Sequence, residues 1–516
     1  MRVERHVSID APADDVWRRV GDPARYPRFM PDVTRCEPVE AGDHDHDHDD
    51  RPRFRITVRV GAVELGSTIA VTASRPGREL RWESVAGVRQ RGAWHLAEHP
   101  DGTTTVTLTV EYHAPHGLLG AFADPAAVPL LHRSTGAWLT RLKADVEGRA
   151  RPSAMTAAVT AAGEAAYDAT VLSRAGLVVP SRPTRLLRAG LTLARRRISP
   201  ATGYAVAAAL HPGDAAVVDE RGTLTFAELD RSADALARRL AEAGVGPGGA
   251  LAVLCRNHRG FVQATLAASR LGADALLLNT GLAGPQLGEI LARERPAGVV
   301  HDDEFTDAVA ALPGGAPRIV AWCDGAPPAG RPTIDELTAG ADEGRVPAPR
   351  RRGRVVLLTS GTTGAPRGAA RQEPGSLTAA AALLGRIPLR ARERTLVASP
   401  LFHSWGYTHL ALASVLSSTL VLRRHFDAEA TLALVERHRI DALVVVPTML
   451  QRLLALPAGV RRRYDTASLR VVATSGAALP GPLATRFMDE FGDVLYNLYG
   501  STEVAWAAIA TPHDLR

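Results

Sequence analysis

From Gly203 onward the sequence alternates short apolar runs with amphipathic helical segments. The apolar runs lie at residues 250–254, 276–278, 355–358, 443–446 and 469–472. They are apolar on both faces, as strands are when helices cover a parallel sheet on both sides. A helical segment before the first of these runs begins with Thr225 and Glu228, which are spaced as a capping box, and ends at Gly244. This alternation predicts a layered α/β domain whose ligand-binding loops gather at the carboxyl ends of its strands.

One of these loops has the sequence LTSGTTGAPRGA at residues 358–369. Its glycines let backbone N–H groups approach an anion closely, and its hydroxyl side chains add further donors. The loop ends in Ala-Pro-Arg, without the lysine and hydroxyl residue of a Walker loop, which disfavours a P-loop NTPase. We interpret the loop as a cradle for polyphosphate. Taken alone, it could also be a surface turn of small residues.

Three further segments follow in order: PLFHSWG at 400–406, SGAAL at 475–479 and YGSTE at 499–503. Together with the phosphate loop they resemble the adenylate-forming (AMP-binding) acyl-CoA synthetase family, in both order and separation. Segments 253–260 and 276–281 are similar to bacterial fatty acyl-CoA synthetases. The resemblance covers about residues 200–516. It implies an acid–CoA ligase that uses ATP, Mg²⁺ and coenzyme A and acts on a small-molecule carboxylic acid, expected to be a medium- or long-chain fatty acid.

The resemblance also implies a role for each matching residue. The phosphates of ATP would lie against Thr359, Ser360, Gly361, Thr362, Thr363, Gly364 and Arg367. Arg367 replaces the family's usual lysine, and a planar guanidinium contacts phosphate differently from an ammonium. The adenine would be met by Ser475, Gly476, Ala477, Ala478 and Asn497 and would stack on Tyr499, which Gly500 follows. The catalytic group would comprise His403 beside the carboxylate substrate, Thr502 at the α-phosphate and Glu503 on Mg²⁺.

The implied reaction joins the carboxylate to the α-phosphorus of ATP, releases pyrophosphate and then forms the thioester. The family supplies a lysine for the first step from a mobile C-terminal domain, whereas no lysine follows Lys143 in this sequence. We therefore expect a truncated or split gene product that lacks the ribose-binding aspartate and the C-terminal domain. Alternatives are a partner chain that supplies the missing part, or a remnant that binds nucleotide without turnover. Losing the lysine is expected to slow adenylate formation by orders of magnitude.

The first 149 residues form a different unit. Residues 54–60 and 105–112 alternate as half-buried strands do, and residues 124–149 repeat apolar positions at helical spacing. The opening segments 7–12, 16–17 and 22–27 resemble the polyketide cyclase/START-like (SRPBCC) superfamily. The resemblance implies an α+β helix-grip fold around a cavity for a hydrophobic ligand. A lipid-binding protein with a non-catalytic nucleotide-binding remnant is therefore the alternative function.

Histidines in this unit carry no predicted chemistry. The alternating His-Asp run at 43–50 is interpreted as a solvated loop, not as a metal site. His95, His113 and His116 are expected to be isolated polar residues, because the sequence offers no carboxylate or nucleophile motif to pair with them.

Residues 150–200 read as a linker, and the AMP-binding domain is assigned to 201–516, its N-terminal part only. The linker's basic amphipathic segment at 184–198 is expected to pack against the next domain; weak contact with an anionic membrane surface is the alternative. Lys and Arg total 61 against 55 Asp and Glu, and the arginine clusters are not interleaved with aromatics, so no nucleic-acid partner is expected. Three distant cysteines and the lack of a signal or membrane segment indicate a cytoplasmic protein.

Overall fold

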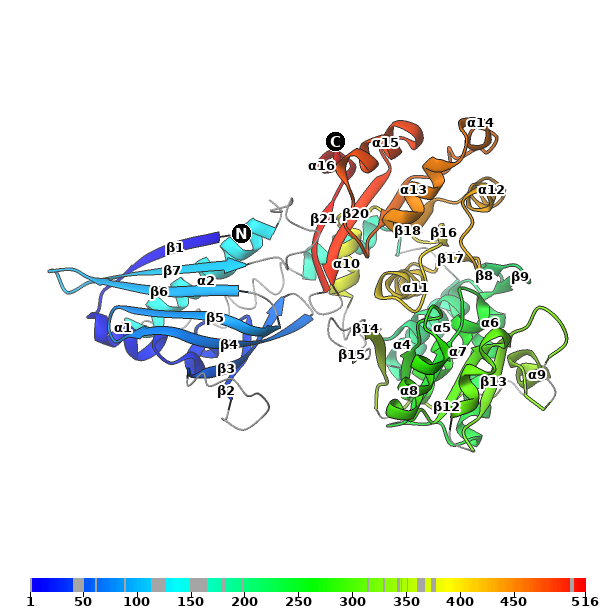
Figure 1. The fold of residues 1–516 in the computed structure, drawn as a ribbon, viewed down its shortest axis with the longest axis horizontal. Helices are drawn as coiled ribbons and strands as arrows, with labels where there is room; N and C mark the ends of the chain where they lie inside the picture. Colours follow the sequence, from blue (N-terminus) through cyan, green and yellow to red (C-terminus); the bar gives the residue numbers. More distant parts are fainter. Residues whose placement is uncertain are drawn as a thin grey trace. The chain divides into compact units, whose positions relative to one another are not determined.

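The fold is described from a computed structural model of the 516-residue chain. The described residues are 2–39, 51–60, 63–87, 90–112, 127–148, 165–177, 182–196, 198–312, 315–327, 330–340, 344, 346–349, 351–359, 367–372, 377–501 and 505–516. The chain forms two compact units, residues 1–167 with 499–509 and residues 168–498 with 510–516 (Figure 1). Within the described ranges, no helix has both the length and the apolar character needed to cross a bilayer.

The first unit contains a seven-stranded antiparallel sheet in the order β1-β7-β6-β5-β4-β3-β2. Its strands are β1 (Arg2–Ile9), β2 (Val33–Pro38), β3 (Arg53–Val60), β4 (Val63–Arg75), β5 (Glu79–Gly87), β6 (Gln90–Glu98) and β7 (Thr104–Tyr112). Its helices are α1 (Ala13–Val20), η1 (Pro23–Arg28) and α2 (Ala127–Val146). The strands predicted from alternation lie within β3 and β7, and the predicted helix corresponds to α2.

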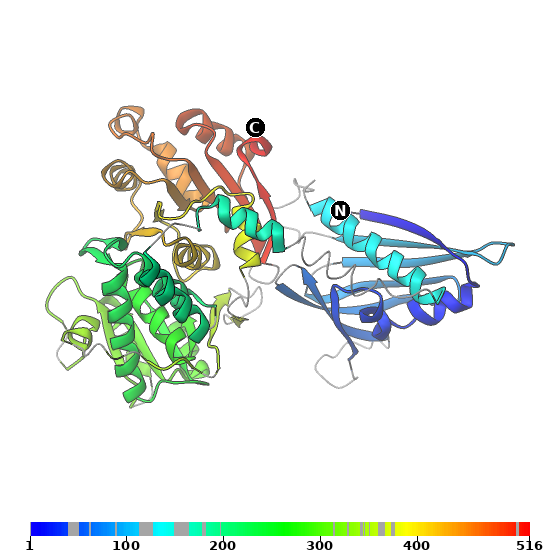
Figure 2. The same ribbon diagram turned by 180° about the vertical axis from the view of Figure 1, so that it is seen from behind.

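Aromatic side chains fill the inner face of this sheet. Trp94 is fully buried and its Nε1 donates to Tyr26 Oη at 3.1 Å, while Phe29 packs edge-on against both rings. Helix α2 lies along the sheet (Figure 2), and its Trp138 donates to Asp32 Oδ2 at 3.1 Å. The helix is therefore held by packing and by a buried indole hydrogen bond. The helix-grip cavity and its hydrophobic ligand stay predictions.

The prediction that His95 is isolated is wrong. His95 on β6 is directly opposite Glu79 on β5, and its Nδ1 lies 3.4 Å from the Glu79 carboxylate. The two residues are 16 positions apart in the sequence, so only the strand pairing brings them together. His113, His116 and the His-Asp run at 43–50 lie outside the described residues.

The chain after residue 200 holds two further sheets. The first has six strands in the order β13-β12-β10-β11-β14-β15, all parallel except the antiparallel pair β14 and β15. The strands are β10 (Ala250–Leu254), β11 (Asp274–Leu277), β12 (Gly298–Asp302), β13 (Arg318–Trp322), β14 (Arg354–Thr359) and β15 (Arg367–Gln372). Associated helices are α6 (Phe226–Glu242), α7 (Arg259–Leu271), α8 (Gly284–Glu294), η2 (Asp303–Phe305), η3 (Ala308–Ala311) and α9 (Ile334–Thr338).

The second sheet has eight strands in the order β21-β20-β19-β18-β16-β17-β8-β9. These are β8 (Ala215–Asp219), β9 (Gly222–Thr225), β16 (Arg394–Val397), β17 (Thr419–Leu422), β18 (Ala442–Val445), β19 (Val471–Thr474), β20 (Leu495–Ser501) and β21 (Ala505–Ala510). The helices are α5 (Pro200–Leu210), α10 (Thr378–Leu384), α11 (Ser404–Leu416), α12 (Ala428–His438), α13 (Pro447–Ala455), α14 (Ala458–Arg461), α15 (Gly481–Phe491) and α16 (Pro512–Leu515). The six neighbouring strands β20, β19, β18, β16, β17 and β8 run parallel to one another. This arrangement confirms the predicted layered α/β architecture.

Helix α4 (Pro183–Arg195) corresponds to the predicted basic amphipathic segment. It packs against α5, with Ala189 and Thr192 buried. Packing against the next domain is therefore observed. Four of its leucines are exposed by 43–65%, namely Leu186, Leu187, Leu191 and Leu193. Contact of this leucine face with a membrane surface stays a prediction.

Candidate functional site

Four neighbouring parallel strands, β16, β18, β19 and β20, end at one edge of the eight-stranded sheet. Val397 pairs with Val444, Val445 with Thr474, and Thr474 with Asn497. The predicted acyl-site segment follows β16, and the predicted adenine-contacting turn follows β19. The structure therefore brings His403, the turn 475–478 and Asn497 to the same edge, where ligand sites of parallel sheets form.

The two loops at this edge depend on glycine. Gly476 has φ +86°, a conformation that residues with a side chain rarely adopt. Gly406 in α11 has no such φ, but a Cβ there would lie 2.2 Å from the carbonyl oxygen of Pro400. The glycine therefore lets the first turn of α11 sit against the loop that carries His403.

His403 immediately precedes α11 and remains exposed, with its ring 4.5 Å from that of Phe402 between centroids. Protein atoms around the imidazole lower its pKa, so the ring is neutral near pH 7. A neutral imidazole can both donate and accept a hydrogen bond, which suits a position beside a polar substrate group.

Several buried polar atoms near this edge have no hydrogen-bond partner among the described residues. They are Ser399 Oγ, Thr474 Oγ1, Asn497 Oδ1 and His409 Nε2. Ser399 and Thr474 are fully buried, and both follow or end a parallel strand. Buried polar groups are nearly always hydrogen-bonded, so unpaired ones gathered at a sheet edge indicate a place for water or a ligand.

Asn257 fixes the loop that leads to His403. Its Nδ2 donates to the carbonyl oxygens of Val397 at 3.1 Å and Ser399 at 2.8 Å, and its Oδ1 accepts from the N–H of Leu401 at 2.8 Å. Asn257 follows β10 in the six-stranded sheet, whereas the loop follows β16 in the other sheet. Sequence reasoning did not assign it this role. The available signal was a polar amide three residues after the end of a fully apolar strand.

A family model described as AMP-binding enzyme matches residues 204–516. The chain belongs to the AMP-binding enzyme family. A second model, described as polyketide cyclase / dehydrase and lipid transport, matches residues 1–147. Both matches agree with the two resemblances found in the sequence. CoA ligases among AMP-binding enzymes use ATP, Mg²⁺ and coenzyme A.

Relatives of this chain include CoA ligases. A feruloyl-CoA synthase of Amycolatopsis sp is 35% identical over 295 residues, which cover 56% of this chain and 57% of that protein. An indoleacetate–CoA ligase of Aromatoleum aromaticum is 30% identical over 312 residues, covering 60% and 61%. The amide bond synthetase McbA from Marinactinospora thermotolerans superposes with a TM-score of 0.53 at 26% identity, covering 62% and 63%. The chain thus spans about three-fifths of the length of these relatives.

Several of the predicted site positions are described only in part. Thr359 ends β14 and is paired with Arg367, the first residue of β15, so the phosphate loop closes this hairpin at the carboxyl end of β14. Tyr499 and Gly500 lie farther along β20 than Asn497. Residues 360–364, Thr502 and Glu503 lie outside the described residues. Their roles stay predictions.

A second polar cluster lies at the carboxyl ends of β10 and β12, where ligand atoms of Cys255, His258 and Asp302 lie within 4.8 Å of one another. His258 Nε2 donates to Asp302 Oδ1 at 2.7 Å, and His258 Nδ1 accepts from the N–H of Gly260 at 3.0 Å. Both ring nitrogens are thus engaged, and burial raises the pKa of the Cys255 thiol well above its usual value. Among the described residues, these contacts form a buried hydrogen-bond network around His258.

His409 gives a testable pH dependence. It is buried, its Nδ1 donates to Trp405 O at 3.1 Å, and burial lowers its pKa to about 4. The folded state therefore binds this proton less readily than the unfolded state, so stability is complete above about pH 6.5 and is lost as pH falls toward 4. From pH 7 to pH 5 this histidine should remove about 2 kcal/mol from the free energy of unfolding.

Urea unfolding of the wild type and His409→Leu at both pH values measures this term. The variant should lose about 2 kcal/mol less than the wild type between pH 7 and pH 5. His425→Gln, at an exposed histidine of the same unit, is the control and should follow the wild type. Equal losses in His409→Leu and the wild type would contradict the assignment.

Proposed function

We propose that residues 201–516 activate a carboxylic acid with ATP and transfer the acyl group to coenzyme A. The observation that supports this most directly is the convergence of His403, the turn 475–478 and Asn497 at one sheet edge, together with the unpaired atoms of Ser399 and Thr474. ATP would supply the leaving pyrophosphate. A carboxylate oxygen bonds to the α-phosphorus as the bond to the bridging oxygen breaks, and the thiol of coenzyme A then displaces AMP from the acyl carbon.

Residues of this chain would hold and orient the reactants. The neutral His403 ring would border the carboxylate and limit its motion. Asn497 Oδ1 is an unfilled acceptor, which suits the amino group of adenine, and Tyr499 would provide a stacking surface next to it. Positioning of this kind accounts for much of the rate in phosphoryl and adenylyl transfer. Thr359, Arg367, Thr502 and Glu503 keep their proposed roles at the phosphates and Mg²⁺.

Two classes of carboxylic acid are candidates for the substrate. A medium- or long-chain fatty acid is proposed from the similarity of segments 253–260 and 276–281 to bacterial fatty acyl-CoA synthetases. Two relatives, a feruloyl-CoA synthase and an indoleacetate–CoA ligase, favour an aromatic acid as the second candidate.

ATP–pyrophosphate exchange with a panel of fatty and aromatic acids tests the proposal, because it isolates the adenylation step. We expect acid-dependent exchange, either by the chain itself or after addition of a C-terminal domain from a related synthetase in case a partner chain supplies that part. Glu503→Gln should lower this exchange. An absence of exchange with every acid under both conditions would refute the function, and exchange with aromatic acids alone would refute the fatty-acid assignment.

A lipid-binding protein is the second candidate function. It is favoured by the match of residues 1–147 to a polyketide cyclase / dehydrase and lipid transport model. Calorimetric titration of the full chain separates the candidates. Fatty-acid binding without ATP binding would support the lipid carrier, whereas ATP binding together with acid-dependent ATP–pyrophosphate exchange would support the ligase.

A further inference from the structure

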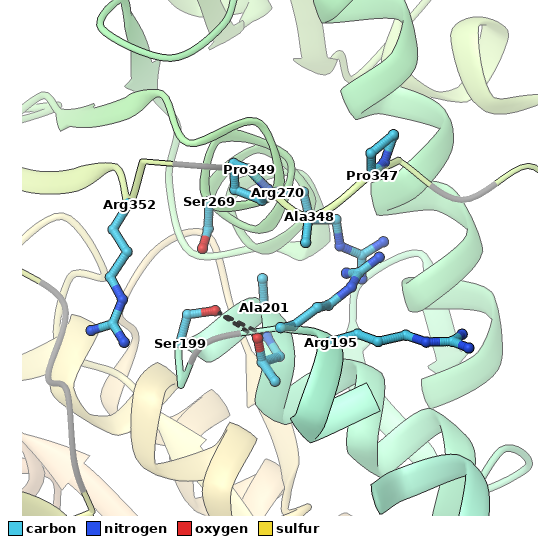
Figure 3. Close-up of a pocket in the computed structure, with 11 residues that line it drawn as sticks. Arg195, Ser199, Ala201, Ser269, Arg270, Pro347, Ala348, Pro349 and Arg352 are labelled. Carbon is cyan, nitrogen blue, oxygen red and sulfur yellow. Dashed lines mark hydrogen bonds between the residues drawn. The ribbon is translucent and has the colours of Figure 1, made fainter. Parts of the chain in front are cut away.

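A small cavity in the second unit is lined by an unusual number of guanidinium groups (Figure 3). Its volume is about 100 Å³, and it lies between the start of α5, the end of α7 and residues 347–352. Four arginines line it: Arg195, Arg196, Arg270 and Arg352. Ser199, Thr202 and Ser269 add hydroxyl groups. The lining is thus rich in hydrogen-bond donors and in positive charge.

Buried aspartates balance only part of this charge. Arg270 forms ion pairs with Asp230 at 2.5 Å and with Asp234 at 2.9 Å, and Arg196 lies 3.8 Å from Asp234. The formal charges of these two arginines and two aspartates sum to zero. Among the described residues, Arg195 and Arg352 have no ion pair, so about two positive charges remain at the cavity.

Donors in the cavity wall are also left unpaired. The Nε atoms of Arg270 and Arg352 are buried without a hydrogen-bond partner in the described part of the chain, and the Arg270 side chain is only 1% exposed. The N-terminus of α5 contributes its helix dipole and the backbone N–H of Ala201. The neighbouring residues do not add a donor, because Pro200 has no N–H and the N–H of Thr202 donates to Ser199 Oγ at 3.1 Å. Buried donors of this kind lack an acceptor, and an oxyanion would supply it.

The cavity is separate from the proposed catalytic edge. Helix α7 follows the carboxyl end of β10, so its last residues, Ser269 and Arg270, return to the amino end of the sheet. Residues 347–352 likewise precede β14. Substrate loops of parallel sheets lie at the carboxyl ends of the strands. This cavity therefore lies at the opposite end of the strands, near their amino ends.

We propose that this cavity binds a phosphoryl dianion, either free phosphate or the phosphate of a monoester. The unpaired guanidinium of Arg352, the buried guanidinium of Arg270 and the N-terminus of α5 together form a favourable environment for phosphate. The proposal concerns a binding site distinct from the ATP site and does not depend on the acid–CoA ligase function.

Isothermal titration with inorganic phosphate at constant ionic strength tests the site. Arg352→Gln removes an unpaired guanidinium without breaking an ion pair among the described residues, and we expect it to weaken phosphate binding at least tenfold, as is typical for loss of a charge-assisted contact. Arg195→Gln should act in the same direction. Arg462→Gln is the matched control, since it removes one exposed positive charge elsewhere in the unit.

Equal phosphate affinity in the wild type, Arg352→Gln and Arg195→Gln would overturn the proposal, and so would the absence of saturable binding to the wild type. Titration with adenosine 3′-monophosphate distinguishes the source of the phosphate. Tighter binding than that of inorganic phosphate, with the same loss in Arg352→Gln, assigns the cavity to a monoester. Similar or weaker binding of the nucleotide assigns it to free phosphate.

Discussion

Replacing Arg270 by leucine is expected to lower the free energy of unfolding by roughly 3–5 kcal/mol. The Arg270 guanidinium donates to Asp230 O at 2.7 Å and is paired with the carboxylates of Asp230 and Asp234, which are only 7% and 5% exposed. The leucine would leave the Asp230 carboxylate buried without a counter-ion and Asp234 with only Arg196, at 3.8 Å, so the carboxylates must take up a proton or draw in water. Because the aspartates are on α6 and the arginine is on α7, the contact between these helices should weaken first.

Urea unfolding followed by circular dichroism measures this loss. Arg239→Leu is the control, because Arg239 pairs with Glu242 on the exposed side of the same helix α6, and its loss should cost less than about 1 kcal/mol. Adding Asp230→Asn and Asp234→Asn to Arg270→Leu should recover part of the stability, since the unpaired charges are then gone. A loss in Arg270→Leu no larger than that in Arg239→Leu would show that the buried network is not needed.

Replacing Asn257 by leucine is expected to slow ATP–pyrophosphate exchange by about 100-fold, with a loss of roughly 2–4 kcal/mol in stability. Leucine has the same number and branching of side-chain heavy atoms, but it cannot hydrogen-bond to Val397 O, Ser399 O or Leu401 N, so three buried backbone groups lose their partner. The loop that positions His403 would then shift relative to the sheet edge. We place Asn257 as a positioning residue, and this prediction rests on the proposed ligase function.

The readout must separate positioning from general destabilisation. At a temperature where the variant is folded, exchange should fall and the KM for the acid should rise, while the KM for ATP should change less. Asn279→Leu is the matched control, since Asn279 Oδ1 caps only the N–H of Gly281 in an exposed turn. Wild-type exchange kinetics in folded Asn257→Leu would exclude the positioning role.

The positions of the buried strands were largely determined by the sequence. The predicted runs at 250–254 and 355–358 correspond to β10 (Ala250–Leu254) and β14 (Arg354–Thr359), and the run at 443–446 is displaced from β18 by one residue. The run at 469–472 begins before β19, because Leu469 is buried in the core ahead of the paired residues. The capping box of Thr225 and Glu228 is present as predicted. Continuous apolar runs and helix caps are local signals. They predict the same strands and helix ends in any tertiary arrangement that buries the apolar residues.

The sequence also placed the four motifs that led to the family. Among them, the segment with His403 and the turn 475–478 follow strands that end at the same sheet edge, which Asn497 on β20 also reaches. Only the tertiary structure divided the strands between two sheets. A strand that is apolar on both faces can pair with any other such strand, so β10 and β18 carry no local information about their neighbours. The hydrogen bonds of Asn257 and the ion pairs of Arg270 depend on the tertiary arrangement of the strands and helices, because each joins elements that lie 40 or more residues apart in the chain. Their partners are selected by packing and by the requirement that buried polar groups be paired, and both conditions arise only after the chain has folded.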